Sequence, residues 1–166
     1  MTAKSGAGRR TVATNRRARH DYDILETVEA GMVLVGTEVK SLREGKVQLA
    51  DAHARVEGGE LWLVGVHLAP YAHADGFHVP DPERRRKLLL HRFEIDKLGA
   101  RVQAEALTLV PLSLYFRDGR AKVELALARG RRRYDKRHAI AERDARREAE
   151  RATSRNRRDG SGVGPR

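Results

Sequence analysis

Hydrophobic and polar residues alternate along several stretches in the middle of the chain. In YDILETVEA, the side chains of Tyr22, Ile24, Val28 and Ala30 fall on one side, and mostly polar side chains fall on the other. A period of two residues is typical of a strand with one buried face. The pattern therefore predicts a strand over residues 22–30.

Two pairs of such stretches are joined by short turn sequences. AHARVEGGELWLVGV is divided by Gly58-Gly59, and LTLVPLSLYF is separated from AKVELALA by a segment containing Asp118-Gly119. These dipeptides adopt the positive φ angles of tight hairpin turns, so we expect two β-hairpins. Because proline cannot donate a ladder hydrogen bond, Pro111 predicts an edge or a bulge in its strand.

A helical period replaces the alternation in VGTEVKSLREGK. Val35, Val39 and Leu42 follow i, i+4, i+7 spacing, Thr37 is placed to cap the start, and Gly45 is placed to end the helix.

A second helical stripe occurs in HRFEIDKLGARVQAEA, where Ile95, Leu98 and Val102 share a face that Gly99 weakens. Several strands and a few helices on a short chain favour a mainly β fold with helices. We expect an OB-like small β-barrel with two or three appended helices. An open α+β sheet is the alternative.

Three zones of different composition divide the chain. We expect a disordered basic N-terminus over 1–13, the barrel over 14–130 and a basic C-terminal tail over 131–166. In the tail, the repeated apolar positions are alanines, which bury too little area to offset the cost of ordering the backbone. We therefore expect it to be mostly disordered when free, to become helical to about residue 152 on ribosome binding, and to be disordered after that.

Charge narrows the possible partners. The 166 residues carry a formal net charge of +11, which attracts polyanions, and the absence of cysteine excludes disulfides and thiolate metal sites. No apolar run is long enough for a membrane helix, and no secretory signal is present. We expect a cytoplasmic monomer that does not bind membranes.

Evidence for an enzyme is weak. No phosphate-binding glycine loop lies between a strand and a helix, so we expect no cofactor. His73, Asp75 and His78 fall in one loop, and a metal-dependent nuclease using them is the alternative function. Their spacing matches no common ligand pair, so we expect neither metal nor catalysis.

Four basic clusters are more informative. They cover residues 15–20, 40–46, 83–87 and 129–137. Arginine pairs bidentately with phosphate and stacks on bases, and several such clusters around one small barrel favour RNA binding. A general RNA-packaging or ribosomal protein is a further alternative.

Several of these blocks occur together in one family. NRRARHDY, EAGMVLVGTEVKSLREGKVQL, DPERRRKLLLH, LTLVPLSLYF, KVELALARG and RRRYDKR closely resemble the bacterial SsrA-binding protein (small protein B) family in order and spacing. The resemblance implies an RNA-binding adaptor that binds the tRNA-like domain of transfer-messenger RNA. With elongation factor Tu and GTP, it would deliver this RNA to stalled ribosomes for trans-translation. The barrel would mimic the anticodon arm, and the tail would probe the decoding centre and the empty mRNA channel.

The resemblance also implies roles for particular residues. The residues matching the family's RNA-binding surface are Asn15, Arg19, His20, Glu29, Leu89 and Lys122. The residues matching the segment needed at the ribosome are Arg131, Arg132, Tyr134, Asp135, Lys136 and Arg137. A core role for Leu89 is an open alternative at this point, and Glu29 is expected to orient neighbouring side chains or to accept a hydrogen bond from a base or ribose.

Overall fold

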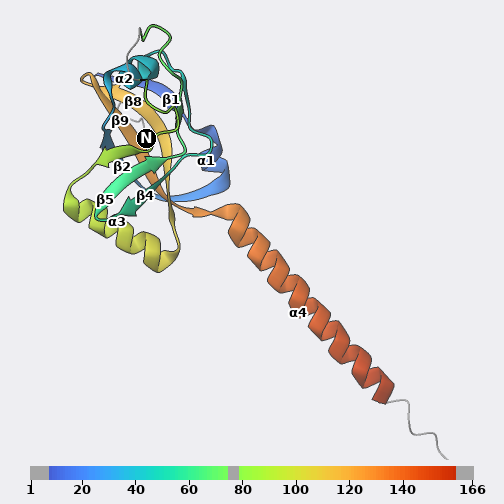
Figure 1. The fold of residues 1–166 in the computed structure, drawn as a ribbon. Coiled ribbons are helices and arrows are strands. Elements are labelled where there is room, and N and C mark those ends of the chain that lie inside the picture. Colours follow the sequence, from blue (N-terminus) through green and yellow to red (C-terminus); the bar gives the residue numbers. More distant parts are fainter. Residues whose placement is uncertain (1–7, 75–78, 160–166) are drawn as a thin grey trace, which may run out of the picture. The chain divides into compact units, whose positions relative to one another are not determined.

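The computed structural model of the protein describes residues 8–74 and 79–159. The chain divides after Gly130 into two compact units, each described by itself. The first unit holds all the strands of the described residues, and the second holds one long helix (Figure 1).

Nine strands and four helices make up the described part of the chain. The strands are β1 (Arg9–Thr14), β2 (Tyr22–Met32), β3 (Val47–Gln48), β4 (His53–Glu57), β5 (Glu60–Val64), β6 (His67–Leu68), β7 (Arg86–Leu89), β8 (Thr108–Arg117) and β9 (Arg120–Gly130). The helices are α1 (Arg16–Asp21), α2 (Gly36–Arg43), α3 (Arg92–Glu105) and α4 (Arg131–Asp159). The first unit is therefore mainly β with several helices, as the sequence predicts.

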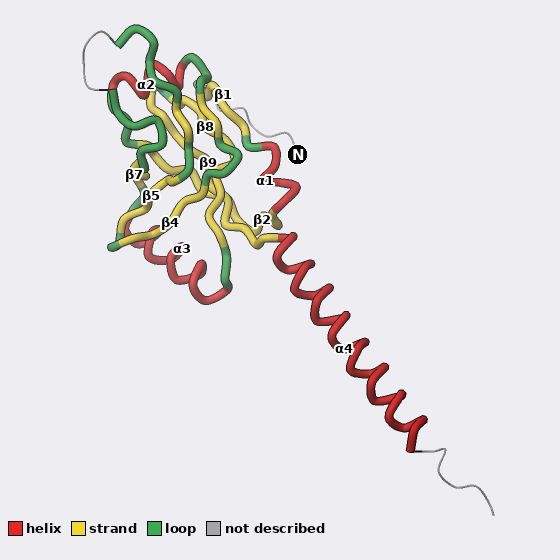
Figure 2. Tube along the Cα trace, turned by 45° about the vertical axis from the view of Figure 1, so that its right-hand side comes forward, coloured by secondary structure: helices red, strands yellow, loops and turns green. Residues whose placement is uncertain are grey.

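The strand pairings of the large sheet close on themselves. The order β8-β4-β5-β7-β2-β9 returns to β8, because β8 and β9 also pair, and every pairing is antiparallel. Figure 2 shows these strands in yellow, curving around a common interior. We call this closed set of six strands the ring. β1 extends the sheet by pairing with β8, and β3 and β6 form a separate two-stranded sheet.

Both predicted hairpin turns are confirmed. Gly58 and Gly59 join β4 to β5 with φ angles of 59° and 76°. Asp118 and Gly119 join β8 to β9 with φ angles of 51° and 76°. The bulge expected at Pro111 is also present, since the β8–β9 register shifts between Pro111 and Ser113.

The interior of the ring is filled by one side of each strand. Leu61, Leu63, Leu114, Val123 and Leu125 are fully buried in the main hydrophobic cluster. Their strand neighbours of opposite parity face outward, so the alternation seen in the sequence separates a core face from a surface face. The outward positions are therefore where a partner can bind.

The expectation of a disordered N-terminus over 1–13 is wrong for its last residues. Residues 9–14 form β1, which pairs with the C-terminal half of β8. The stretch RRTVAT has too little alternation to predict a strand. The exposed backbone edge of β8 supplies its hydrogen-bond partners, and the Arg9 guanidinium lies 3.8 Å above the Tyr115 ring.

The two predicted helices are found as α2 and α3. α2 ends as predicted, since Gly45 has a φ of 72°, but Thr37 is not its cap. The helix begins one residue before Thr37, and the Glu38 carboxylate accepts a hydrogen bond of 3.0 Å from the Val35 backbone N–H. α3 buries Ile95 and Leu98, as its stripe predicts.

α1 has no counterpart in the sequence predictions. Its residues are almost all charged, and only Ala18 is buried. Ala18 packs in a second, smaller cluster on the outside of β8 and β9, with Val110, Leu112, Ala126 and Ala128. The small side chains of Ala126 and Ala128 on β9 leave room for a helix at one end of the outer face.

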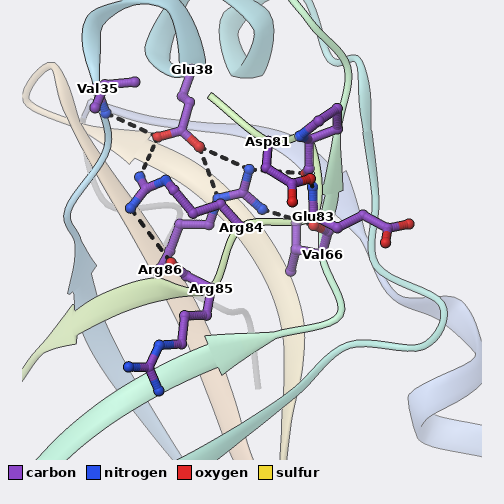
Figure 3. A network of polar contacts seen from close by, with 9 residues as sticks. Val35, Glu38, Val66, Asp81, Glu83, Arg84, Arg85 and Arg86 are labelled. Atoms are coloured by element: carbon purple, nitrogen blue, oxygen red, sulfur yellow. Dashed lines mark hydrogen bonds and ion pairs between the residues drawn. The ribbon is translucent and has the colours of Figure 1, made fainter. Parts of the chain in front are cut away.

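A buried ion network joins α2 to β7. Arg86, whose side chain is 1% exposed, donates from Nε to Glu38 Oε2 at 2.9 Å, and Arg84 donates to the other oxygen of the same carboxylate. Arg86 also donates to the backbone carbonyls of Val66 and Pro82 at 2.7 and 3.0 Å (Figure 3). This network fixes the segment before β7 against α2.

The second unit is the single helix α4. It has 29 residues, and its side chains from Ile140 to Ser154 are exposed. It runs to Asp159, beyond residue 152, where the helix is expected from the sequence to end. The segment is rich in alanine, glutamate and arginine, and its length exceeds the roughly 12–15 residues below which an isolated helix is marginal.

Candidate RNA-binding surface

Three neighbouring strands place Lys122, Gly31 and Leu89 in one row. Lys122 on β9 pairs with Gly31 on β2, and Gly31 pairs with Leu89 on β7. Their strand neighbours Val123 and Leu88 are buried in the core, so the row faces outward. Leu89 is 53% exposed, which corrects the alternative that it is a core residue.

Because Gly31 has no side chain, it leaves space in the row between Leu89 and Lys122. A methyl group added to Gly31 would lie 3.4 Å from the Cβ of Leu89 and 3.8 Å from Nζ of Lys122. The row borders a groove of about 330 Å³ whose lining is mostly apolar and includes two cationic residues, Arg120 and Lys122. Its lining includes Met32, Leu34, Val39, Phe116, Arg120 and Ala121.

Glu29 lies one outward position before Gly31 on β2. The Tyr115 hydroxyl donates a hydrogen bond to Glu29 Oε2, and Arg117 Nη1 lies 3.0 Å from the same oxygen. Burial and the Glu29 carboxylate raise the pKa of Tyr115, so the phenol stays protonated and keeps donating. The carboxylate is thus held in one orientation on a surface that is otherwise cationic.

The carboxylate that faces Glu29 across the strands is also paired. Glu124 on β9 lies opposite Glu29, and it accepts hydrogen bonds from Arg9 at 3.2 Å and from Ser113 at 3.1 Å. Arg9 also stacks on Tyr115, so one arginine from β1 links both carboxylate sites. The repulsion expected between facing carboxylates is offset by cations on either side.

α1 places two further predicted residues beside this face. Arg19 and His20 are exposed in the last turn of α1, which packs on the outer face of β8 and β9 through Ala18. Asn15 differs from the prediction, because it is 7% exposed. Its side-chain amide donates to the Pro111 carbonyl at 3.1 Å, so in the chain alone it anchors the start of α1.

Each cation of the basic cluster over 83–87 has a carboxylate partner, and two of the four are held by the buried Glu38. Arg84 and Arg86 bind the buried Glu38 carboxylate, Arg85 pairs with Glu57 at 2.9 Å, and Lys87 pairs with Glu60 at 3.0 Å. The sequence interpretation missed these pairs because the carboxylates lie on other elements: Glu38 on α2, Glu57 on β4 and Glu60 on β5. Buried and more exposed residues alternate along β7, and a strand with that alternation places Arg86 and Leu88 at inward positions.

The tail residues singled out in the sequence belong to the first turns of α4. Arg131 is exposed. The side chains of Arg132, Tyr134, Asp135, Lys136 and Arg137 lie outside the described residues, as do Asp75 and His78 of the candidate metal site. Among the side chains that the structure describes, no group of three or more His, Asp or Glu residues could hold a metal ion.

No helix in the described ranges is both long enough and apolar enough to cross a membrane.

Known proteins match nearly the whole chain. The family model described as SmpB protein matches residues 12–155. The SsrA-binding protein of Frankia casuarinae (strain DSM 45818 / CECT 9043 / HFP020203 / CcI3) is 60% identical over 148 residues, which are 89% of this chain and 92% of that protein. The SsrA-binding protein of Thermobifida fusca (strain YX) is 60% identical over 152 residues, which are 92% and 94% of the two chains.

A solved structure is similar as well. A chain from the work described as "tmRNA-SmpB: a journey to the center of the bacterial ribosome" aligns with a TM-score of 0.61 and 53% identity, covering 77% of this chain and 93% of that one. The family model and the relatives agree with the sequence blocks quoted above. This chain belongs to the SmpB protein family.

Proposed function

We propose that this chain is a non-catalytic RNA-binding adaptor of trans-translation, which binds the tRNA-like domain of transfer-messenger RNA and delivers it to stalled ribosomes. The names of its relatives, SsrA-binding protein and a tmRNA–SmpB structure, support this proposal. The observation that carries it is the outward row of Lys122, Gly31 and Leu89 next to the oriented Glu29 carboxylate.

Each member of this surface suits a different part of an RNA. The Lys122 ammonium pairs with a phosphate, and the exposed Leu89 side chain offers an apolar contact for a base or a ribose. Glu29 accepts hydrogen bonds, so it binds a base N–H or a ribose 2′-hydroxyl and repels a phosphate. A surface with both signs of charge and an apolar centre recognises a folded RNA rather than a uniform polyanion.

The ring serves in this proposal as an OB-like barrel that takes the place of the anticodon arm. Arg19 and His20 on α1 extend the contact along the outer face of the ring. Asn15 contributes by fixing the start of α1, and it can exchange its contact with Pro111 for one to RNA.

The tail is assigned to the ribosome. Its cations would bind ribosomal RNA at the decoding centre and along the empty mRNA channel, and Tyr134 would stack on a base. Elongation factor Tu with GTP would join through the charged RNA, and the protein would act as a cytoplasmic monomer. The tail residues assigned here are Arg131, Arg132, Tyr134, Asp135, Lys136 and Arg137.

Equilibrium binding to a transcript of the tRNA-like domain tests this function. Affinity should fall steeply between about 50 and 200 mM salt, because each neutralised phosphate releases counterions. Lys122→Ala should weaken binding and lower the salt slope by nearly one, whereas Lys97→Ala, which removes an exposed charge from α3, should change neither the affinity for this RNA nor its specificity.

Affinity that does not depend on salt, or equal effects of the two substitutions, would reject the proposed surface. Incubation with the RNA and Mg²⁺ or Mn²⁺ separates an adaptor from a nuclease, since an adaptor leaves the RNA intact.

A further inference from the structure

Trp62 is the only tryptophan in the sequence, and it faces away from the core of the ring. Its neighbours on β5, Leu61 and Leu63, are fully buried in the main cluster, so Trp62 points to the outer face. The strand register places Arg55 on β4 and Lys87 on β7 directly beside it. A cation, an aromatic ring and a second cation thus form a row across three strands.

A third cation covers the indole. The Arg85 guanidinium lies 4.3 Å from the centroid of the Trp62 ring, and Arg85 Nη1 is 2.9 Å from Glu57 Oε2. The Trp62 ring packs against one face of the planar Arg85 guanidinium, and the Glu57 carboxylate accepts a hydrogen bond from its edge. The Arg85 side chain is nevertheless 55% exposed, so its other face is open to solvent. We call Trp62, Arg85, Arg55 and Lys87 the Trp62 platform.

The ion pairs of the platform do not prevent phosphate binding. Arg55 lies 3.4 Å from Glu57, and Lys87 lies 3.0 Å from Glu60. All of these side chains are between 41% and 55% exposed. Exposed pairs of this kind contribute only about 0–1 kcal/mol, and the three cations exceed the two carboxylates by one charge. A phosphate can therefore compete for the cations.

The Trp62 platform meets the surface proposed for transfer-messenger RNA at β7, where Lys87 and Leu89 share the outward face, but Trp62 itself lies away from Lys122. In the closed order β8-β4-β5-β7-β2-β9, β5 and β9 are three strands apart in either direction. Outward side chains on β5 and on β9 therefore point to opposite sides of the ring. The two surfaces therefore adjoin at β7 and extend from it in opposite directions around the ring.

We propose that the Trp62 platform binds an unstacked base of a single-stranded RNA segment, which stacks on the open face of Arg85 while Arg55 and Lys87 contact the flanking phosphates. Bases stack on arginine planes and aromatic rings in single-stranded RNA recognition. A carboxylate would pair with the charge of Arg85 but would not stack on its flat face. Because Trp62 and Glu57 fix the plane of this guanidinium, the site favours a base over an acidic peptide. This site goes beyond the proposed function.

The single tryptophan makes the site directly observable in the full chain. Tryptophan emission is recorded while a hexa-adenylate RNA is added, and binding of the labelled hexanucleotide is followed in parallel by anisotropy. We expect a saturable emission change with the RNA, and none with an abasic oligomer of equal length or with hexaglutamate. An equal response to hexaglutamate would overturn the base-stacking site in favour of an acidic protein partner.

Substitutions separate stacking from charge. Arg85→Lys keeps the charge but loses the plane, and it should weaken the site about tenfold, which corresponds to the loss of one stacked base. The matched control Arg10→Lys, on exposed β1, should leave the emission response unchanged. If Arg85→Lys and Arg10→Lys respond alike, the platform does not bind a base.

A second pair of measurements keeps this site independent of the proposed function. Lys122→Ala should weaken binding of the tRNA-like RNA while leaving the Trp62 response to hexa-adenylate intact. Loss of the response in Lys122→Ala would show that the chain has one RNA surface and contradict a distinct Trp62 platform.

Discussion

The phenolic hydroxyl of Tyr115 on β8 donates a hydrogen bond across β9 to the Glu29 carboxylate on β2. Tyr115 is 1% exposed, whereas Glu29 is half-buried at the surface proposed to bind RNA. A buried donor on one strand therefore sets the direction of a surface acceptor two strands away. The orientation of Glu29 is built into the ring rather than acquired on binding.

Removing this donor should weaken RNA binding without removing any group that would touch RNA. We expect Tyr115→Phe to lower the affinity for the tRNA-like RNA by several-fold, because a hydrogen bond to a charged group contributes about 1.5–3 kcal/mol and Arg117 retains part of the orientation. Tyr71→Phe, at a half-buried ring beside Lys40, is the matched control. Equal affinities of the two variants would show that Glu29 needs no positioning.

The buried phenol of Tyr115 should also make the folded protein less stable at alkaline pH. Burial raises its pKa above the ordinary value of 10.0, and the hydrogen bond to Glu29 adds to the rise. The folded state therefore binds the phenolic proton more tightly than the unfolded state, and the resulting stability is present below pH 10.0 and is lost as the pH rises above it. Denaturant unfolding across this range should show a steeper alkaline decline for the unmodified chain than for Tyr115→Phe. Parallel declines would contradict the raised pKa.

Gly31 should be needed for access to the row between Leu89 and Lys122. Gly31→Val would place methyl groups against the Cβ of Leu89, which an added Cβ at this position already approaches to 3.4 Å. We expect at least a tenfold loss of affinity for the tRNA-like RNA in equilibrium binding, with cooperative unfolding retained. The control is Gly36→Val on α2, where an added Cβ meets no atom within 4 Å. Full affinity of Gly31→Val would contradict the open row.

The Glu38 carboxylate should make stability sensitive to acid. Burial alone would raise its pKa, but hydrogen bonds from Arg84, the Val35 N–H and Arg86 together lower it. The folded state thus binds this proton more weakly, so the stability is present above the ordinary value of 4.5 and is lost as the pH falls through the lowered pKa.

Substitution at Glu38 leaves two arginines without their shared partner. Breaking a buried pair costs about 3–5 kcal/mol, so we expect Glu38→Gln to lower the free energy of unfolding by that order near neutral pH. Glu44→Gln, in the exposed pair with Lys46, should cost about 0–1 kcal/mol. Urea unfolding at neutral and acid pH measures both values. Equal costs would show that the network in Figure 3 contributes no more than a surface pair.

The sequence predicted the features that depend on neighbouring residues. Gly58-Gly59 and Asp118-Gly119 have the dihedral preferences of hairpin turns wherever they occur, and Pro111 lacks a donor in any strand. Their consequences in the structure are therefore the expected ones.

Features that depend on distant residues could not be predicted in this way. Asn15 and Arg86 look like members of basic surface clusters, but Asn15 is held by the Pro111 carbonyl and Arg86 by Glu38, residues far away in the chain. β1 forms because β8 has an open edge, which nothing in RRTVAT reveals. The outward row at Leu89 was reached through the family resemblance, since KLLL alone is equally consistent with a core strand.

The alanine-rich composition of α4 leads to a prediction about the stability of this helix. If α4 is stable without RNA because of its alanines, Ala145→Gly should lower the helical circular dichroism of the full chain, with a cost of about 1 kcal/mol. Ala50→Gly, in the exposed segment after β3, is the control. A spectrum that shows no helix beyond that of the first unit would instead support a tail that folds only on the ribosome.

The central claim is that the first unit holds the tRNA-like RNA while the segment after Gly130 acts on the ribosome. The most direct measurement compares the full chain with a chain ending at Gly130, in equilibrium binding to the tRNA-like RNA and in a reconstituted tagging reaction on stalled ribosomes. The account predicts affinities within a few-fold of each other and no tagging by the shortened chain. Loss of RNA binding in parallel with tagging would contradict it.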